Sequence, residues 1–225
     1  QKAIIRYVST NGNRVLTTDE VTGKSGEAIA YSTTSQITEF KKQGYKLVSD
    51  EFTAGGAKVY DYDTARDQVY TVTLSERVEP VNPDNPTPQP NTPVNPGQPD
   101  SPRWPGTVEN LDNKESVSRT IHYVYEDGSK AKDDVVETLN FKRWSNVNLV
   151  TGHIDFQDWT TNDDTFDKVV SPTIAGYTAD KSEIPAVSGV QAKDQDRVET
   201  VTYRKDAQKA IIRYVSTNGN RVLTT

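Results

Sequence analysis

Runs in which apolar and polar residues alternate make up most of the regular pattern of the chain, and they predict strands rather than helices. Residues 2–8 and 14–22 are rich in β-branched side chains. They flank Asn11-Gly12, and an Asn-Gly pair between two such runs is the strongest short-range signal for a β-hairpin. The first predicted element is therefore a hairpin.

A single helix interrupts this pattern, at residues 35–43. Ser35 is expected to cap its amino terminus, and Gly44 follows as a stop signal, because glycine readily adopts the left-handed conformation that ends many helices. Ile37 and Phe40 lie three positions apart and therefore share one face. We expect that face to pack on a sheet.

Two more strands are predicted after the helix, at residues 45–49 and 68–77. Alternation along the second of them places Tyr70, Val72 and Leu74 on one face. The predicted order is thus strand, strand, helix, strand, strand. This order suggests a β-grasp domain over residues 1–79.

Residues 80–105 form a stretch of different character, which holds most of the twelve prolines of the chain. Proline-rich segments favour extended polyproline II structure and act as semi-rigid spacers. We predict a linker between two domains, with Trp104 clamping it onto one of them. Two alternatives are a ligand for a proline-recognition domain and a substrate for glycosylation.

A second hairpin is predicted from residues 118–125 and 134–141, with a turn at Glu126-Asp127-Gly128-Ser129. Residues 142–170 show no clear helical stripe. Two segments of this half align loosely with the first half, which predicts a second β-grasp-like domain over residues 106–207. The aligned segments are residues 5–8 with 121–124 and residues 69–74 with 198–203. The predicted fold class is mainly β, or α+β.

The last eighteen residues, 208–225, reproduce residues 1–18 letter for letter. We therefore expect a tandem repeat, with 208–225 as the opening hairpin of a further copy. An isolated hairpin is marginally stable in water, so this one is expected to fray unless it packs on something. Long tandem repeats typically build modular arrays whose binding grows with copy number, which favours a binding or structural protein over an enzyme.

Composition narrows the function classes further. The chain has no cysteine, which excludes disulfides, thiolate metal sites and a cysteine nucleophile. Its net charge is −6 and its Lys and Arg residues form no cluster. Nucleic acid is therefore a poor partner, because neutralising phosphates supplies most of that affinity. No apolar stretch is long enough to span a membrane, so we expect no membrane insertion of this segment.

The second half carries a set of motifs that is quite specific in combination. The motifs are Thr120-Ile121-x-Tyr123, Phe141-x-Arg143, Val150-Thr151-Gly152, Trp159 and Ser171-Pro172-x-Ile174-x-Gly176-Tyr177. With these motifs, residues 116–204 resemble the mucin-binding repeat of cell-surface adhesins from lactic-acid bacteria. The whole repeat unit resembles one repeat of the large mucus-binding proteins of lactobacilli, in which a β-grasp-like domain precedes the mucin-binding domain.

The resemblance implies an extracellular protein anchored to the bacterial cell wall, which adheres to host mucin glycans and gains avidity from neighbouring repeats. It also implies a link to immunoglobulin binding. It brings no catalytic motif, so we expect no enzyme and no cofactor apart from a candidate structural calcium. Two alternatives stay open, an immunoglobulin-binding module and a structural stalk repeat without a ligand of its own.

Aromatic side chains are the first candidate site residues, because sugars present apolar C–H faces that stack on aromatic rings. We select Trp144, Trp159 and Tyr177 as glycan-binding candidates. The alternative is that these rings are core residues, since a Trp with a partnered indole N–H buries a large apolar area.

Acidic residues form the second candidate site. Calcium is bound by six to eight oxygen ligands, which Asp and Asn side chains can supply. The spacing here matches no EF-hand loop, so the alternative is a solvated acidic loop. The candidate ligands are Asp155, Asp158, Asp163, Asp164 and Asp167.

A protein-binding surface is the third candidate, on the first hairpin and the helix. A β-grasp domain can bind another protein by adding a strand or through its helix face. We select Asn11, Glu39 and Lys42, against the alternative of a solvated face. Paired carboxylates could serve a glycosidase, but acidic residues this common form pairs by chance, and the chain shows no nucleophile motif. His122 is expected on a strand face.

Overall fold

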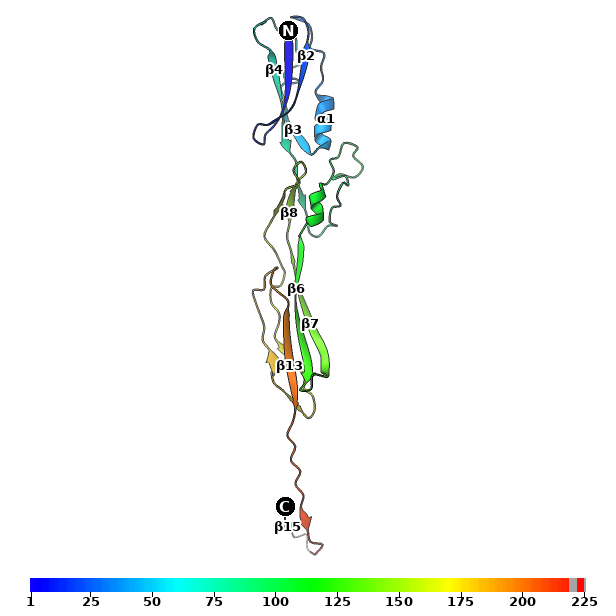
Figure 1. Ribbon diagram of the computed structural model, residues 1–225, viewed down its shortest axis with the longest axis vertical. Coiled ribbons are helices and arrows are strands. Elements are labelled where there is room, and N and C mark those ends of the chain that lie inside the picture. Colours follow the sequence, from blue (N-terminus) through cyan, green and yellow to red (C-terminus); the bar gives the residue numbers. More distant parts are fainter. Residues whose placement is uncertain (219–221, 225) are drawn as a thin grey trace. The chain divides into compact units, whose positions relative to one another are not determined.

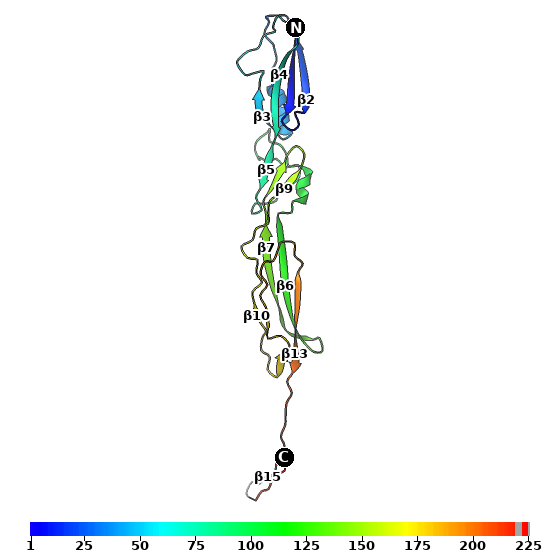
Figure 2. The same cartoon turned by 90° about the vertical axis from the view of Figure 1, so that its left-hand side faces the viewer.

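The computed structural model describes residues 1–218 and 222–224. It confirms a mainly β fold with a single α-helix (Figures 1 and 2). Contacts divide the chain into two compact units, which are taken in turn below. The first unit comprises Gln1–Lys114 and Lys142–Thr160, and the second comprises Glu115–Phe141 and Thr161–Thr225. In the part of the chain that the structure describes, no helix is long and apolar enough to cross a membrane.

The main sheet of the first unit has the predicted β-grasp order. Strands β1 (Lys2–Ser9) and β2 (Val15–Thr22) form the hairpin, α1 (Thr34–Lys42) follows, and β3 (Tyr45–Asp50) and β4 (Gln68–Glu76) complete the sheet. The strand order is β2-β1-β4-β3. The central pair β1–β4 is parallel and the outer pairs are antiparallel.

The core of this sheet lies under α1. Alternation along β1 and β4 directs side chains of both strands toward the helix, and Ile37 and Phe40 meet them as predicted. The rings of Tyr7 and Phe40 lie 5.6 Å apart between centroids. The strand residues that are fully buried here are Ala3, Ile5 and Tyr7 of β1 and Val72 and Leu74 of β4.

The helix begins earlier than predicted. Its N-cap is Thr33 rather than Ser35, and no side chain caps the first turn. The Thr33 hydroxyl instead donates to Oδ2 of Asp50 at 2.6 Å, which ties the helix start to β3. At the other end Gly44 has φ +93° and terminates the helix as predicted.

A second, smaller sheet completes the first unit. It contains β5 (Val78–Val81), β8 (Ser145–Asn148) and β9 (Ile154–Phe156) in the order β5-β8-β9, with all pairs antiparallel. A short 3-10 helix, η1 (Gly106–Asn110), packs beside it through Val108. The first unit thus includes residues 80–114 and 142–160 together with the predicted domain of residues 1–79.

The proline-rich segment packs on this smaller sheet. Val94 and Trp104 contact the cluster that Val81 and Val147 help to form. The segment also folds back on itself, because the N–H of Trp104 donates to the carbonyl of Thr92 at 2.9 Å. Residues 80–105 therefore differ from the extended spacer that we predicted, whereas the clamping role of Trp104 is confirmed.

The second unit holds another four-stranded sheet, ordered β11-β13-β6-β7. Its strands are β6 (Lys114–Tyr125), β7 (Lys130–Lys142), β11 (Tyr177–Ala179) and β13 (Arg197–Lys205). The central pair β6–β13 is parallel. A two-stranded ladder of β10 (Val169–Val170) and β12 (Glu183–Ile184) lies apart from this sheet in the strand pairing.

The two sheets have the same topology, and their central parallel pairs have the same register. Strands β7, β6, β13 and β11 take the places of β2, β1, β4 and β3. Tyr7 lies opposite Val72 in the parallel pair of the first unit, and Tyr123 lies opposite Val201 in the second. The loose alignment of the two halves therefore pairs residues that occupy equivalent positions.

The edge strands also correspond. Gly44-Tyr45 begins β3 and Gly176-Tyr177 begins β11, and both glycines have positive φ. The tyrosines pair with Glu76 and Lys205, which lie four positions after the matched valines. The units differ in their cover, because no helix is present among the described residues of the second unit.

The copied segment after residue 207 differs from residues 1–18 in strand pairing and in exposure. Among the described residues, strands β14 (Tyr214–Val215) and β15 (Val222–Thr224) pair with each other only. Residues 219–221, which end the predicted turn and begin the predicted returning strand, lie outside the described residues. The apolar residues of the copied strand are 59–67% exposed, whereas their counterparts in β1 are at most 9% exposed. These residues are Ile211, Ile212 and Tyr214, which match Ile4, Ile5 and Tyr7.

Candidate functional site

The three aromatic candidates are divided between the two units. Trp144 and Trp159 belong to the first unit, on either side of β9, whereas Tyr177 begins β11 in the second. Each unit therefore has to be considered as a separate candidate site.

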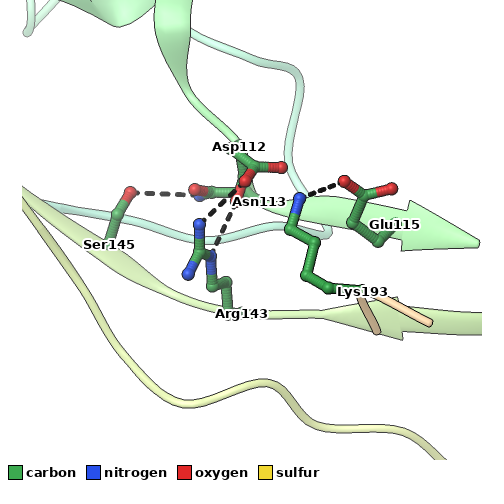
Figure 3. Close-up of polar contacts among 6 residues, drawn as sticks. All are labelled: Asp112, Asn113, Glu115, Arg143, Ser145 and Lys193. Atoms are coloured by element: carbon green, nitrogen blue, oxygen red, sulfur yellow. Dashed lines mark hydrogen bonds and ion pairs between the residues drawn. The ribbon is translucent and has the colours of Figure 1, made fainter. Parts of the chain in front are cut away.

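Trp159 packs on an arginine in the first unit. The guanidinium of Arg143 lies 4.3 Å from the ring centroid of Trp159 and 3.9 Å from that of Phe156. Its Nε and Nη2 donate to the carbonyl and carboxylate oxygens of Asp112, at 2.7 and 3.0 Å (Figure 3). This stack links β9 and the residues beside β8 to the segment before β6. The Trp159 ring therefore has a structural role in the first unit.

Trp144 remains the more accessible of the two tryptophans, with 42% of its surface exposed. Its carbonyl accepts a hydrogen bond from the N–H of Gln157 at 2.9 Å, which fixes its backbone beside β9. Trp144 lines none of the four clefts described in the two units. Trp144 therefore offers one exposed ring on an open surface.

A small polar cleft of about 130 Å³ lies in the first unit, near Asn82 and Asn85. Asn113, which also lines it, is buried and donates through Nδ2 to Oγ of Ser145 at 3.1 Å (Figure 3). Oδ1 of Asn113 has no hydrogen-bond partner. The size of this cleft suits ordered water better than a sugar.

The second unit has a larger cleft where β6, β11 and β13 meet, which we call the tyrosine cleft. Its volume is about 310 Å³. The rings of Tyr125 and Tyr177 lie 4.7 Å apart between centroids and are tilted by 45°. The lining residues are Tyr125, Glu126, Asp127, Tyr177, Tyr203 and Lys205.

Hydrogen bonds shape the charge in this cleft. The Ser129 hydroxyl and N–H both donate to Oδ1 of Asp127 and hold the pKa of that carboxyl below its usual range. Burial raises the pKa of Tyr203, whose hydroxyl donates to the carbonyl of Pro172 at 2.6 Å. At neutral pH the cleft therefore holds an ionised Asp127 beside the neutral phenol of Tyr203.

A buried arginine that the sequence analysis missed organises the rest of the second unit. Arg119 is fully buried on β6 and its Nε donates to Glu137 at 2.7 Å. It also donates to the carbonyl of Pro185 at 3.0 Å and to that of Asp167. Lys193 and Glu115 form a separate ion pair in this unit (Figure 3). These contacts tie loops to the sheet and present no group to a ligand.

The sequence models of two domain families match the chain. A mucin binding domain matches residues 1–76, and a Muc B2-like domain matches residues 108–207. The chain belongs to the mucin-binding repeat family. The resemblance found in the sequence is thereby confirmed. No curated protein is a significant match to the chain.

Solved structures of similar repeats extend over both units of this mucin-binding repeat. The crystal structure of Mub-RV is 26% identical with a TM-score of 0.72, and 92% of this chain matches 100% of that one. A type 2 repeat of the mucus binding protein MUB from Lactobacillus reuteri is 28% identical with a TM-score of 0.59, with the same shares covered. The similarity therefore spans a whole repeat.

The aspartate candidates of this mucin-binding repeat are exposed and point to local partners. Oδ1 of Asp163 accepts from the N–H of Thr165 at 2.9 Å, and Oδ1 of Asp155 lies 3.0 Å from Nε2 of His153. Across residues 1–218 and 222–224, no three His, Cys, Asp or Glu side chains converge to hold a metal ion. The structure does not bring together Asp155, Asp158, Asp163, Asp164 and Asp167.

The protein-binding candidates are exposed but engaged with neighbours. Nδ2 of Asn11 donates to Glu76 at 3.2 Å. Glu39 and Lys42 pair with each other at 2.9 Å, and Lys42 also lies 3.7 Å from Asp100 of the proline-rich segment. The chain thus has a solvated polar surface at these positions.

Proposed function

We propose that this chain is one repeat of an extracellular bacterial adhesin, anchored to the cell wall, that binds host mucus through mucin glycans. The observation that carries this proposal is the pair of family matches, one on residues 1–76 and one on residues 108–207. Full-length similarity to a repeat of a mucus binding protein supports it. The proposal assigns no catalytic step to the chain.

Tandem copies explain how weak sites could give firm adhesion. The identity between residues 1–18 and 208–225 indicates that copies follow one another directly. Linked copies convert later binding events into intramolecular ones, which raises overall avidity by about 10² to 10⁴ without any new contact. We therefore propose a weak site in each repeat and strong binding by the array.

The test is surface plasmon resonance of the whole chain over immobilised mucin, before and after periodate oxidation of its sugars. The whole chain is needed because the first unit includes residues 142–160, so a cut at residue 79 would remove part of its packing. We expect saturable binding with a dissociation constant of about 1 μM to 1 mM, abolished by periodate. Albumin serves as the control surface.

Two results would contradict the proposal, and each identifies a different function. Binding to immobilised immunoglobulin that survives periodate treatment, with no signal on mucin, would indicate an immunoglobulin-binding module. No binding to either surface at concentrations up to about 1 mM would indicate a stalk repeat, since single weak sites become visible in that range.

A further inference from the structure

The second unit leaves open a sheet position that the first unit covers. Tyr45 and Tyr177 occupy equivalent positions at the start of the edge strand. In the first unit Phe40 of α1 packs on Tyr45, with 5.6 Å between ring centroids, and Tyr45 is buried. The described residues of the second unit include no helix, and Tyr177 is only half-buried. The same fold thus closes this position in one unit and exposes it in the other.

The neighbour of Tyr177 differs between the units as well. Tyr125 lies opposite Tyr203, just as Ser9 lies opposite Leu74 in the first unit. Ser9 is buried in a sheet of the same topology, so the fold does not require an aromatic ring at this position. The stacked pair of Tyr125 and Tyr177 is therefore an addition to the shared framework.

Both phenol groups of this pair are available for a ligand. Within the described residues, neither the Tyr125 nor the Tyr177 hydroxyl makes a hydrogen bond, whereas the Tyr203 hydroxyl beneath them is satisfied by Pro172. Buried tyrosines usually find a partner for the hydroxyl, and an amphipathic ring suits a surface that is apolar on one side and wet on the other. A pyranose offers such a surface, with C–H bonds on a face and hydroxyls around its edge.

The charges around the tyrosine cleft nearly balance. Glu126 pairs with Arg204 at 3.4 Å, and the charge of Lys205 helps to lower the pKa of Asp127. Ser129 occupies Oδ1 of Asp127, which leaves Oδ2 able to accept hydrogen bonds from hydroxyl groups. Two carboxylates therefore face two cations, and a site without net charge favours a neutral sugar over an anionic one.

We infer that the tyrosine cleft binds one neutral pyranose, a galactose or an N-acetylhexosamine, at the end of a mucin glycan. This inference rests on the proposed function, because it names the site and the sugar class for the same binding. The volume of the tyrosine cleft, about 310 Å³, accommodates a monosaccharide. The sugar stacks on the accessible part of the half-buried Tyr177 ring, and Asp127 accepts hydrogen bonds from its hydroxyl groups.

Three variants of the full chain test this site on immobilised mucin. Tyr177→Leu removes the stacking ring. A Tyr125→Phe/Tyr177→Phe double variant removes only the two hydroxyls and keeps the packing, so it remains informative if Tyr177→Leu unfolds the unit. Tyr62→Leu is the matched control, because Tyr62 is 80% exposed and lies in the first unit. Far-ultraviolet circular dichroism checks that each variant is folded.

We expect Tyr177→Leu to weaken mucin binding about tenfold or more, the double Phe variant several-fold, and the control less than about twofold. In nuclear magnetic resonance titrations of the wild type, methyl β-galactoside or N-acetylglucosamine should shift tyrosine ring signals more than N-acetylneuraminic acid. Wild-type binding to mucin with no loss in the two folded cleft variants would overturn the cleft and leave the proposed function standing. A preference for N-acetylneuraminic acid would overturn the neutral class. Absence of wild-type binding would overturn both proposals.

Discussion

At the scale of single residues, Gly44 meets two demands at once. Its φ of +93° lies in the left-handed region, where a Cβ atom is strained. A Cβ added to it would also lie 2.9 Å from Cβ of Leu149 and 3.0 Å from its carbonyl carbon. The residue that ends α1 is therefore also the point where the chain approaches the loop after β8.

Replacing Gly44 by Ala should destabilise the first unit by about 2–4 kcal/mol, because backbone strain and overpacking add together. Gly12→Ala is the matched control, since Gly12 has φ +68° but no atom within 4 Å of the added Cβ. We expect a loss of about 1 kcal/mol there. All three tryptophans lie in the first unit, so their fluorescence in a urea titration measures its unfolding. Equal losses in both variants would show that the contact with Leu149 is unimportant.

Tyr31 makes the stability of the first unit depend on pH. Its hydroxyl donates to Asp19 at 2.5 Å and lies 2.8 Å from that of Tyr7. Burial, together with these hydrogen bonds, raises the pKa of Tyr31, and burial also raises the pKa of Tyr7. The folded state therefore holds these protons more tightly than the unfolded state, in which tyrosine ionises near pH 10. Stability is fully present below about pH 10 and is lost as the pH rises above it.

A Tyr31→Phe variant should show this effect directly. At neutral pH it loses a hydrogen bond to a carboxylate, and we expect a cost of about 1.5–3 kcal/mol. Between about pH 9 and 11 its unfolding free energy should fall less steeply than that of the wild type, because one ionisation no longer opposes folding. Urea titrations at several pH values, followed by tryptophan fluorescence, give both quantities. Parallel pH curves for the two proteins would contradict the assignment to Tyr31.

At the scale of elements, local signals explain which parts of the fold could be predicted. Alternation along β4, the Asn11-Gly12 turn and the stop at Gly44 act within a few residues, so the main sheet of the first unit followed from the sequence. The predicted helix cap at Ser35 was wrong. The cap residue is Thr33, and its hydroxyl donates to Asp50, which is distant in sequence. Such a tertiary contact leaves no local pattern.

Local sequence signals could not predict the packing of the proline-rich segment or the tyrosine cleft, because both depend on contacts between residues distant in sequence. Composition predicted an open spacer, yet widely spaced Val81, Val94 and Trp104 supply enough apolar surface to pack. The cleft joins Tyr125 and Tyr177 through β13, which lies between them in the sheet. A comparison of Gly44-Tyr45 with Gly176-Tyr177 would have identified Tyr177, one of the two stacked tyrosines of the cleft.

Removing the Trp104 side chain tests whether the proline-rich segment is part of the first unit. We expect Trp104→Ala to destabilise the unit by about 2–3 kcal/mol, because a half-buried indole leaves a cavity. Thermolysin should then cleave residues 80–105 faster. Trp144→Ala is the matched control, since its ring is 42% exposed, and should cost about 0.5 kcal/mol. If Trp104→Ala left both the stability and the rate of cleavage unchanged, residues 80–105 would be better described as an extended spacer.

At the scale of the whole molecule, one sequence has two environments. Residues 4–9 form the central strand of a sheet, between β2 and β4. Among the described residues, the identical stretch 211–216 pairs only through Tyr214 and Val215, with β15, and is largely exposed. Local sequence is the same, so the difference arises from partners: β1 has a parallel neighbour in β4 and a helix over one face. Burial of this strand is therefore a property of a complete copy of the repeat.

Hydrogen exchange measured by mass spectrometry can test this directly, because a peptide from residues 4–9 has the same mass as one from 211–216. In the 225-residue chain we expect this peptide to split into two equal populations, one protected and one rapidly exchanged. Appending residues 19–207 after Thr225 supplies the second copy with its own β4 and α1. The same peptide should then give one protected population, because the second strand gains the hydrogen bonds and cover of the first. A persistent rapidly exchanging half would mean that neighbouring copies do not fold as independent repeats, and the array would then lack the intact sites that multivalent binding requires.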